Sequence, residues 1–242
     1  MNSRRSLAPI SLAWLLIQAL AGTAFALPGA ATAPDTLAQR LQPCTACHGA
    51  EGRASREGYL PRIAGKPAGY LYHQLLNFRD GRRSNAAMAG LLVHQRDDYL
   101  REMAAYFAAL DLPPAATPSG SAAADVMARG ETLVRRGDAS RRLPACTACH
   151  GAALAGTLPA VPGLLGLPRD YLIGQIGAWQ TGKRHAIEPD CMADISRRLG
   201  AEDASAVASW LAAQPIAPGL RAGKPDPGPT PLACGSVSQP SR

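Results

Sequence analysis

Apolar residues along the chain recur at the spacing of an α-helix. Between residues 70 and 79, Leu71, Leu75 and Phe78 stand at i, i+4 and i+7, so they share one face of a predicted helix. A further helix is predicted to start at Asp97, which can cap it, and to run to about Leu110. No stretch shows convincing strand alternation, so the pattern predicts an all-α fold.

The same pattern returns about a hundred residues later, which indicates an internal repeat. Leu172, Ile176 and Trp179 match the apolar positions of the helix predicted over residues 70–79. Further helices are predicted over residues 35–41, 125–136 and 201–214, and the last of these repeats the helix that starts at Asp97. The two halves are therefore expected to be tandem helical domains with one fold, each built around a cofactor.

Composition and local motifs divide the chain into five segments. Arg4 and Arg5 precede an apolar stretch that ends in an A-x-A cleavage site, which is typical of a cleaved export signal. An uncleaved membrane anchor is the alternative, although the apolar run is short for a bilayer span. The expected segments are a signal peptide (1–26), a first domain (27–111), a proline-containing linker (112–123), a second domain (124–214) and a Pro/Gly-rich tail (215–242).

The sequence Cys-Thr-Ala-Cys-His occurs in both halves. A C-x-x-C-H motif is the attachment site of a c-type haem: two thiols add to one porphyrin, and the histidine binds its iron. Thioredoxin-type pairs and a four-cysteine zinc site also use C-x-x-C, but the histidine in both copies favours two covalent haem c groups. The expected haem-binding residues are Cys44, Cys47, His48, Cys146, Cys149 and His150.

Met88 and Met192 stand at matching positions of the repeat, in Gly/Ala-containing stretches between the middle and last helices. Methionine is a soft iron ligand, so these two residues are the expected sixth ligands of the haem irons. Met103 is the rival in the first half. It falls on the apolar face of its helix, and its repeat counterpart is Val207, so a packing role is expected.

Other side chains have weaker expected roles. His73, His94 and His185 have no histidine partner in the other half, so surface roles are expected for them. The carbonyl of Pro61 or Pro162 could fix the haem histidine that precedes it, or these could be plain turn prolines. Four cations could contact haem propionates or simply be solvated: Arg79, Lys66 and the matched pair Arg83 and Arg184, which is favoured.

Cys191 and Cys234 remain after the haem motifs are counted. An even remainder in an exported protein predicts a disulfide, which would tie the tail to the loop that holds Met192. Free thiols are the alternative, and Cys191 would then be a rival ligand beside the second haem.

Composition limits the remaining functions. The chain has 242 residues, a formal net charge of +7 and only 5% aromatic residues, so two small domains would have little core without a haem in each. The mildly basic balance is compatible with acidic redox partners. No run of Lys and Arg with interleaved aromatics indicates DNA or RNA binding.

Residues 35 to 214 resemble the dihaem cytochrome c4 group. The resemblance rests on Cys-Thr-Ala-Cys-His-Gly in both halves, Pro61 to Gly65, Tyr70 to Arg83, Met88-Ala89-Gly90 and Ala104 to Leu110. It implies two class I cytochrome c domains, His/Met-ligated haems and periplasmic electron transfer, often towards a terminal oxidase. The chain departs from the group at Lys66, where glutamine is usual, and in the cysteine beside Met192.

Three functions compete. The leading one is a periplasmic one-electron carrier between respiratory redox partners, an oxidase or a dehydrogenase, with no catalytic residues of its own. The alternative is a dedicated electron-accepting subunit of a periplasmic dehydrogenase complex, such as a sulfide- or alcohol-oxidising one. A dihaem peroxidase is less favoured, because it needs an open iron with positioned acid and base groups, and none stands out near either methionine.

Overall fold

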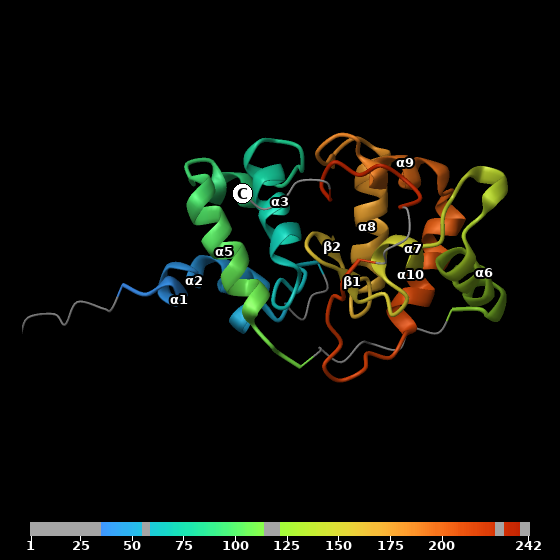
Figure 1. The fold of residues 1–242 in the computed structure, drawn as a ribbon, viewed down its shortest axis with the longest axis horizontal. Helices are drawn as coiled ribbons and strands as arrows, with labels where there is room; N and C mark the ends of the chain where they lie inside the picture. The colour runs from blue at the N-terminus through green and yellow to red at the C-terminus, as the bar shows by residue number, and fades with distance from the viewer. Residues whose placement is uncertain (1–34, 55–58, 114–121, 226–229, 238–242) are drawn as a thin grey trace, which may run out of the picture. The chain divides into compact units, whose positions relative to one another are not determined.

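A computed structural model describes residues 35–54, 59–113, 122–225 and 230–237 (Figure 1). The expected signal peptide at 1–26 and most of the expected linker at 112–123 lie outside these residues. From Leu37 onward the chain forms one compact unit. Among the described residues, none of the helices has the length and apolar character needed to cross a membrane.

The first half is helical, as predicted. Its core lies between α3 and α5, where Leu71 and Phe78 pack with Leu100, Met103 and Phe107. The helices are α1 (Leu37–Arg40), α2 (Gln42–His48), the 3₁₀ turn η2 (Ala50–Gly52), α3 (Ala68–Arg79), α4 (Ala86–Leu92) and α5 (Asp97–Ala109). The first of these is shorter than the helix predicted over residues 35–41.

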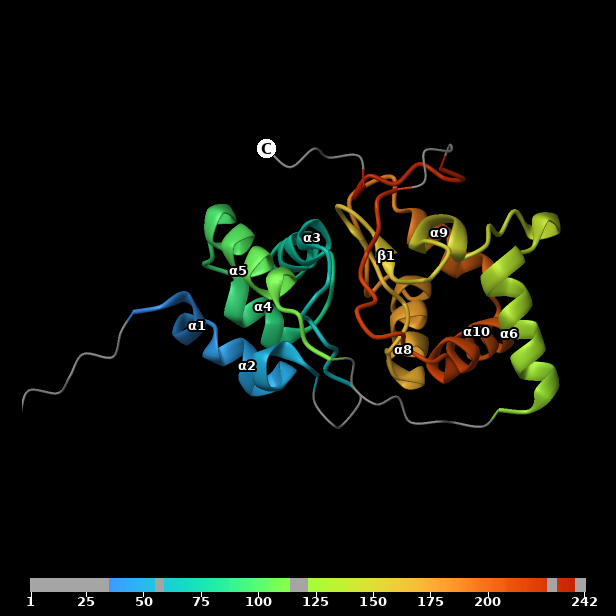
Figure 2. The ribbon, with the colours of Figure 1, turned by 60° about the horizontal axis from the view of Figure 1, so that its bottom comes forward.

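The second half opens with a longer helix, α6, as predicted, and then repeats this order. Its elements are α6 (Ala124–Arg136), the 3₁₀ turn η3 (Ala139–Arg141), α7 (Thr147–His150), β1 (Gly156–Thr157), β2 (Val161–Pro162), α8 (Arg169–Gln180), α9 (Cys191–Arg198) and α10 (Ala201–Ala213). In Figure 2, α6 lies beside α10, against which it packs. The two backbones approach closely at Gly130, where a Cβ atom would lie 2.3 Å from the Ala206 carbonyl oxygen. Only glycine fits that crossing without a shift of one helix.

The middle and last helices of the two halves have equal lengths. Helices α3 and α8 each contain 12 residues, and α5 and α10 each contain 13. The turn before the middle helix is also repeated, because Gly65 and Gly166 adopt φ angles of 72° and 74°. Such positive values favour glycine, which explains why both copies carry it there.

Three local predictions differ from the structure. β1 and β2 form an antiparallel pair, with Gly156 opposite Pro162, but two-residue strands are too short to show alternation in a sequence. Asp97 does not cap α5: its carboxylate accepts a 2.6 Å hydrogen bond from Arg79 Nη1 instead. The stretches around Met88 and Met192 are the short helices α4 and α9 rather than loops.

The tail returns to the second half. The Gly223 amide donates to the Gly156 carbonyl at 3.1 Å, and the Leu158 amide donates to the Gly223 carbonyl at 2.8 Å. Further along, Cys234 is bonded to Cys191, with the two Cα atoms 5.1 Å apart, so the predicted disulfide is confirmed. The described part of the tail has neither helix nor strand, and these contacts hold it against β1 and α9.

Candidate functional site

Each haem motif ends a helix with a buried histidine. His48 closes α2 and His150 closes α7, and their exposed fractions are 9% and 7%. The His48 Nδ1 atom donates to the Pro61 carbonyl at 2.8 Å, and the His150 Nδ1 atom donates to the Pro162 carbonyl at 2.7 Å. Donation from Nδ1 leaves Nε2 free to bind a metal. Of the two roles open to these prolines, the structure therefore shows the carbonyl contact in both halves.

The electrostatics of these side chains suit metal binding by histidine and disfavour a thiol redox pair. Burial lowers the pKa of both His48 and His150, which keeps the rings neutral and able to coordinate. Burial raises the pKa of the Cys146 thiol to about 11, whereas thioredoxin-type pairs rely on a lowered value. Among the described residues, no three His, Cys, Asp or Glu side chains gather into a metal-binding cluster.

A symmetric set of hydrogen bonds joins the two halves. Arg83 donates to Gln74 Oε1 at 2.9 Å and to Gln175 Oε1 at 2.6 Å. Arg184 donates to the same two oxygens, at 2.9 Å to Gln74 and 2.7 Å to Gln175. The backbones of the two arginine segments also pair as an antiparallel bridge. Equivalent positions of the repeat thus contact each other. The two glutamines are also functional candidates, for which the sequence pattern gave a matched position in the repeat but no role.

These two arginines have no carboxylate partner among the described residues. Arg184 is 5% exposed and stacks on the Trp179 ring at 3.7 Å, and Arg83 stacks on the Phe78 ring at 4.5 Å. Burial and the neighbouring Arg83 lower the pKa of Arg184 to about 10. The Trp179 Nε1 donor is buried with no acceptor among the described residues. A buried cation with a partly buried one beside it, together with a buried donor that lacks an acceptor, calls for an anion in this region.

Curated relatives match most of the chain. The "thiosulfate dehydrogenase electron acceptor" of Thiomonas intermedia is 38% identical over 217 residues, which cover 89% of this chain and 93% of the relative. The "cytochrome c4" of Pseudomonas aeruginosa is 33% identical and matches over 69% of this chain and 82% of the relative. The chain belongs to the dihaem cytochrome c4 family. No family model matches it.

Solved structures give the same assignment for the fold. Reduced cytochrome c4 from Pseudomonas stutzeri superposes with a TM-score of 0.61 at 28% identity, over 72% of this chain and 95% of that chain. Thiosulfate dehydrogenase (TsdBA) from Marichromatium purpuratum, in its "as isolated" form, also gives 0.61 at 34% identity, over 71% of this chain. The chain spans 36% of the length of that enzyme chain.

Membership in the cytochrome c4 family confirms the main predictions from the sequence. The protein is an all-α pair of tandem c-type domains that binds two covalent haem c groups. It is an electron carrier, or the electron-accepting partner of an oxidoreductase, rather than a catalyst. The chemistry of the described residues fits this cofactor in both halves, because each C-x-x-C-H helix holds a neutral, oriented histidine and free thiols.

The arginine pair also fits a cytochrome c4. Haem propionates are carboxylates, so they would supply the anions that Arg83, Arg184 and the Trp179 Nε1 donor lack. Arg79, a weaker candidate for this role, forms ion pairs with Asp80 and Asp97, so its charge is already neutralised. Burial lowers the pKa of Lys66, which lies next to this region and stays a possible further cation for a propionate.

The two matched methionines lie in matched helices. Met88 is partly buried against the first core cluster, and the Asn85 side chain caps α4 by accepting from the Met88 amide at 3.0 Å. Met192 is partly buried at the start of α9, where Asp190 accepts from the Ala193 amide at 3.0 Å. In both halves a capping side chain therefore fixes the first turn of the helix that holds the methionine. Met103 lies in the first core, as expected for packing.

The expected surface role of His73 is wrong. His73 is 6% exposed in α3, and burial lowers its pKa. It lies one turn before Asn77, which is also buried and accepts from Arg82 Nε at 2.7 Å. These two residues form a second, polar buried face of α3, which an apolar periodicity cannot reveal. His94 and His185 are exposed, as expected.

Replacement of Arg184 tests the assignment of the buried cations. A cation near a haem favours its reduced state, so Arg184→Gln is expected to lower the reduction potential of a haem by about 40 mV, or ~1 kcal/mol. A redox titration followed by absorbance measures this change. Arg169→Gln is the control, because Arg169 is half-exposed and pairs with Asp170. Equal potentials in wild type and Arg184→Gln would contradict a place for this arginine beside a propionate.

Proposed function

We propose that the protein is the electron acceptor of a thiosulfate dehydrogenase and carries electrons one at a time on its two haems. The observation that carries this proposal is the match over 93% of the Thiomonas relative, which bears that name. A second acceptor of the same name, from Stutzerimonas stutzeri, is 36% identical over 77% of its length. The likeness to the Marichromatium enzyme chain also supports it, because that chain contains a portion with the same fold.

Within the proposal, each half holds its haem by thioethers and two axial ligands. Cys44 and Cys47 attach the first haem, with His48 and Met88 as ligands. In the second half the corresponding residues are Cys146, Cys149, His150 and Met192. The buried, neutral histidines and the matched helices of the methionines support this set. His/Met ligation leaves no open iron position, which suits electron transfer and disfavours peroxidase chemistry.

The chain's own residues serve this function by orienting the haem histidines and by holding the two halves together. The proline carbonyls fix the planes of His48 and His150, and they raise the basicity of each ring. Arg83 and Arg184 each donate hydrogen bonds to a glutamine of the other half, and these bonds tie the halves together at equivalent positions of the repeat. That region would also neutralise the propionates, so that charge on each haem costs less in a buried site.

Export to the periplasm is part of the proposal. The signal-like residues 1–26 support it, and so does a disulfide, which forms in oxidising compartments. A general carrier that delivers electrons to a terminal oxidase is the second candidate. It is favoured by the several relatives named cytochrome c4, which match at 28–33% identity.

Thiosulfate-driven reduction tests the proposed function. When the oxidised holoprotein is mixed anaerobically with a thiosulfate dehydrogenase and thiosulfate, both haems should become reduced. Two thiosulfate ions that couple to tetrathionate release two electrons, one for each haem. Stopped-flow absorbance measures the rate and extent, with thiosulfate alone as the control. Reduction no faster than in that control would rule out the acceptor role, and rapid oxidation of the reduced protein by a terminal oxidase would then favour the second candidate.

Methionine ligation has its own spectroscopic test. The oxidised protein should show a weak absorption band at the red end of the spectrum from charge transfer between methionine sulfur and Fe(III). Met88→Ala and Met192→Ala should each remove about half of its intensity, since one of two ligands is lost in each. Met103→Leu should leave the band unchanged, because Met103 packs in the core. An unchanged band in Met88→Ala would show that another residue binds the first haem.

The disulfide should protect only the second methionine site. Cys191 precedes Met192, and its bond to Cys234 closes a loop with a sequence separation of 43 residues. Such a cross-link stabilises a fold by about 2–4 kcal/mol. In Cys191→Ser/Cys234→Ser, half of the methionine–iron band should therefore disappear at a lower guanidinium concentration than in wild type. The half that belongs to Met88 is the internal control, and a parallel shift of both halves would refute a local clamp.

A further inference from the structure

A basic hollow lies on the second half next to its haem motif. The hollow measures about 520 Å³ and is lined by Arg136 from the end of α6, Arg142 after η3 and Arg198 from the end of α9. Pro231 and Leu232 of the tail form another part of its wall. Arg198 therefore meets Arg136 and Arg142 at one surface, although it lies more than 50 residues later in the sequence.

Two of these arginines are free of neutralising partners. Arg198 is paired with Asp194 and donates to the Arg142 carbonyl, which positions the backbone of Arg142. The side chains of Arg136 and Arg142 are exposed, and neither has an ion pair or hydrogen bond within the part of the chain that the structure describes. Exposed cations without partners can attract and hold an acidic surface.

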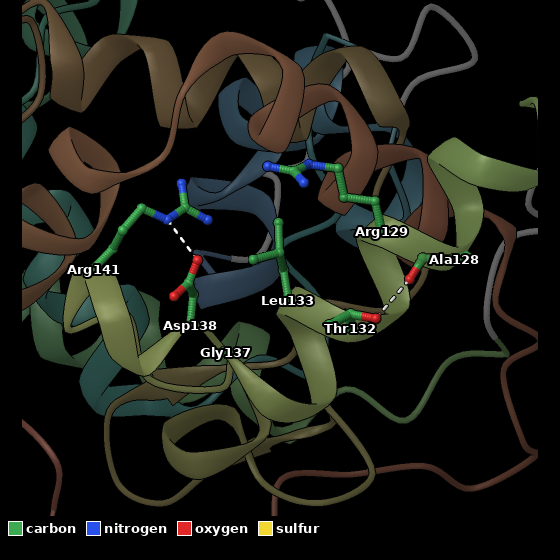
Figure 3. Close-up of a pocket in the computed structure, with 7 residues that line it drawn as sticks. All are labelled: Ala128, Arg129, Thr132, Leu133, Gly137, Asp138 and Arg141. Atoms are coloured by element: carbon green, nitrogen blue, oxygen red, sulfur yellow. Dashed lines mark hydrogen bonds and ion pairs between the residues drawn. The ribbon is translucent and has the colours of Figure 1, made fainter.

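The neighbouring hollow shows the contrast. In Figure 3, Arg141 is turned onto Asp138, and Arg129 lies across the same hollow of about 410 Å³. Both arginines also pair with the buried carboxylate of Asp203, so their charge is used inside the fold. The net charge of the sequence does not distinguish these arginines, but of the two hollows it is the one with Arg136 and Arg142 that has unpaired cationic charge among the described residues.

The basic hollow lies at the entrance to the second haem motif. Its lining includes Leu143 and Pro144, and Cys146 follows two residues later. Two residues of chain span at most about 7 Å, so a protein bound in the hollow would lie against the segment that carries a haem thioether. Electrostatic attraction at this place would bring a partner to the edge of the second haem.

We infer that the hollow lined by Arg136, Arg142 and Arg198 docks an acidic surface of the redox partner protein, and that electrons cross at the second haem. The inference rests on the proposed function, because it takes Cys146 as a haem attachment residue and the chain as a carrier. The repeat supplies a matched control. Arg40 is exposed and precedes Cys44 by four residues, as Arg142 precedes Cys146.

The test is oxidation of the fully reduced holoprotein by hexacyanoferrate(III), an anionic one-electron oxidant, with poly-L-glutamate as a stand-in for an acidic protein surface. In stopped-flow measurements at low salt, Arg142→Glu should slow oxidation about threefold to tenfold, and Arg136→Glu should have a similar effect. Poly-L-glutamate should slow the wild type and Arg40→Glu, but not Arg142→Glu. Salt at about 0.5 M should remove these differences.

Several outcomes would overturn the inference. Equal slowing by Arg40→Glu and Arg142→Glu would mean that the whole net charge, rather than this hollow, attracts the oxidant. Competition by millimolar sulfate as strong as that by poly-L-glutamate would make the hollow a small-anion site. The extent of oxidation separates these results from a failure of the carrier function, because a dihaem carrier must release two electrons per chain in every variant.

Discussion

The arrangement of this protein depends on one constraint: Arg184 is buried and Arg83 beside it is partly buried, and neither guanidinium group has a carboxylate partner among the described residues. Arg83 and Arg184 lie in the contact between the halves, where their described partners are neutral glutamine oxygens, the Tyr171 hydroxyl and aromatic rings. Hydrogen bonds to amides orient a guanidinium but do not cancel its charge, and a buried uncompensated charge costs several kcal/mol. In the proposed assignment, anionic haem propionates would remove that cost, so haem binding would also stabilise the contact between the two halves.

The repeat explains why the arrangement is symmetric at its centre and asymmetric at its edges. Each arginine reaches its own glutamine and that of the other half, so one sequence pattern, duplicated, builds both sides of the contact. Away from the contact, and within the residues that the structure describes, the second half alone has a long helix before its haem motif, the β1–β2 pair and the returning tail. In that described part, its haem motif is held by more of the chain than that of the first half. Two copies of one haem motif thus have different surroundings.

The sequence was sufficient for features that rest on short-range patterns. The haem motifs depend on spacing within five residues, and the main helices follow from apolar periodicity, so both could be predicted. The disulfide between Cys191 and Cys234 could be predicted because every other cysteine had a role. The unpredicted features depend on contacts between distant segments. Asp97 pairs with Arg79 instead of capping its own helix, and His73 is buried on a polar face that has no apolar signal.

The same reasoning applies to charge. The chain has 25 Lys and Arg and 18 Asp and Glu residues, and a count of +7 says nothing about where the excess lies. Folding sorts the charges: Asp203 and Asp138 neutralise arginines near α6 and η3, and Asp194 neutralises Arg198 on α9. The arginines left over at Arg136 and Arg142 flank the segment that leads to Cys146. Local pairing therefore converts a weak average charge into a defined basic surface at the second haem motif, and electrostatic steering depends on such a surface rather than on the average.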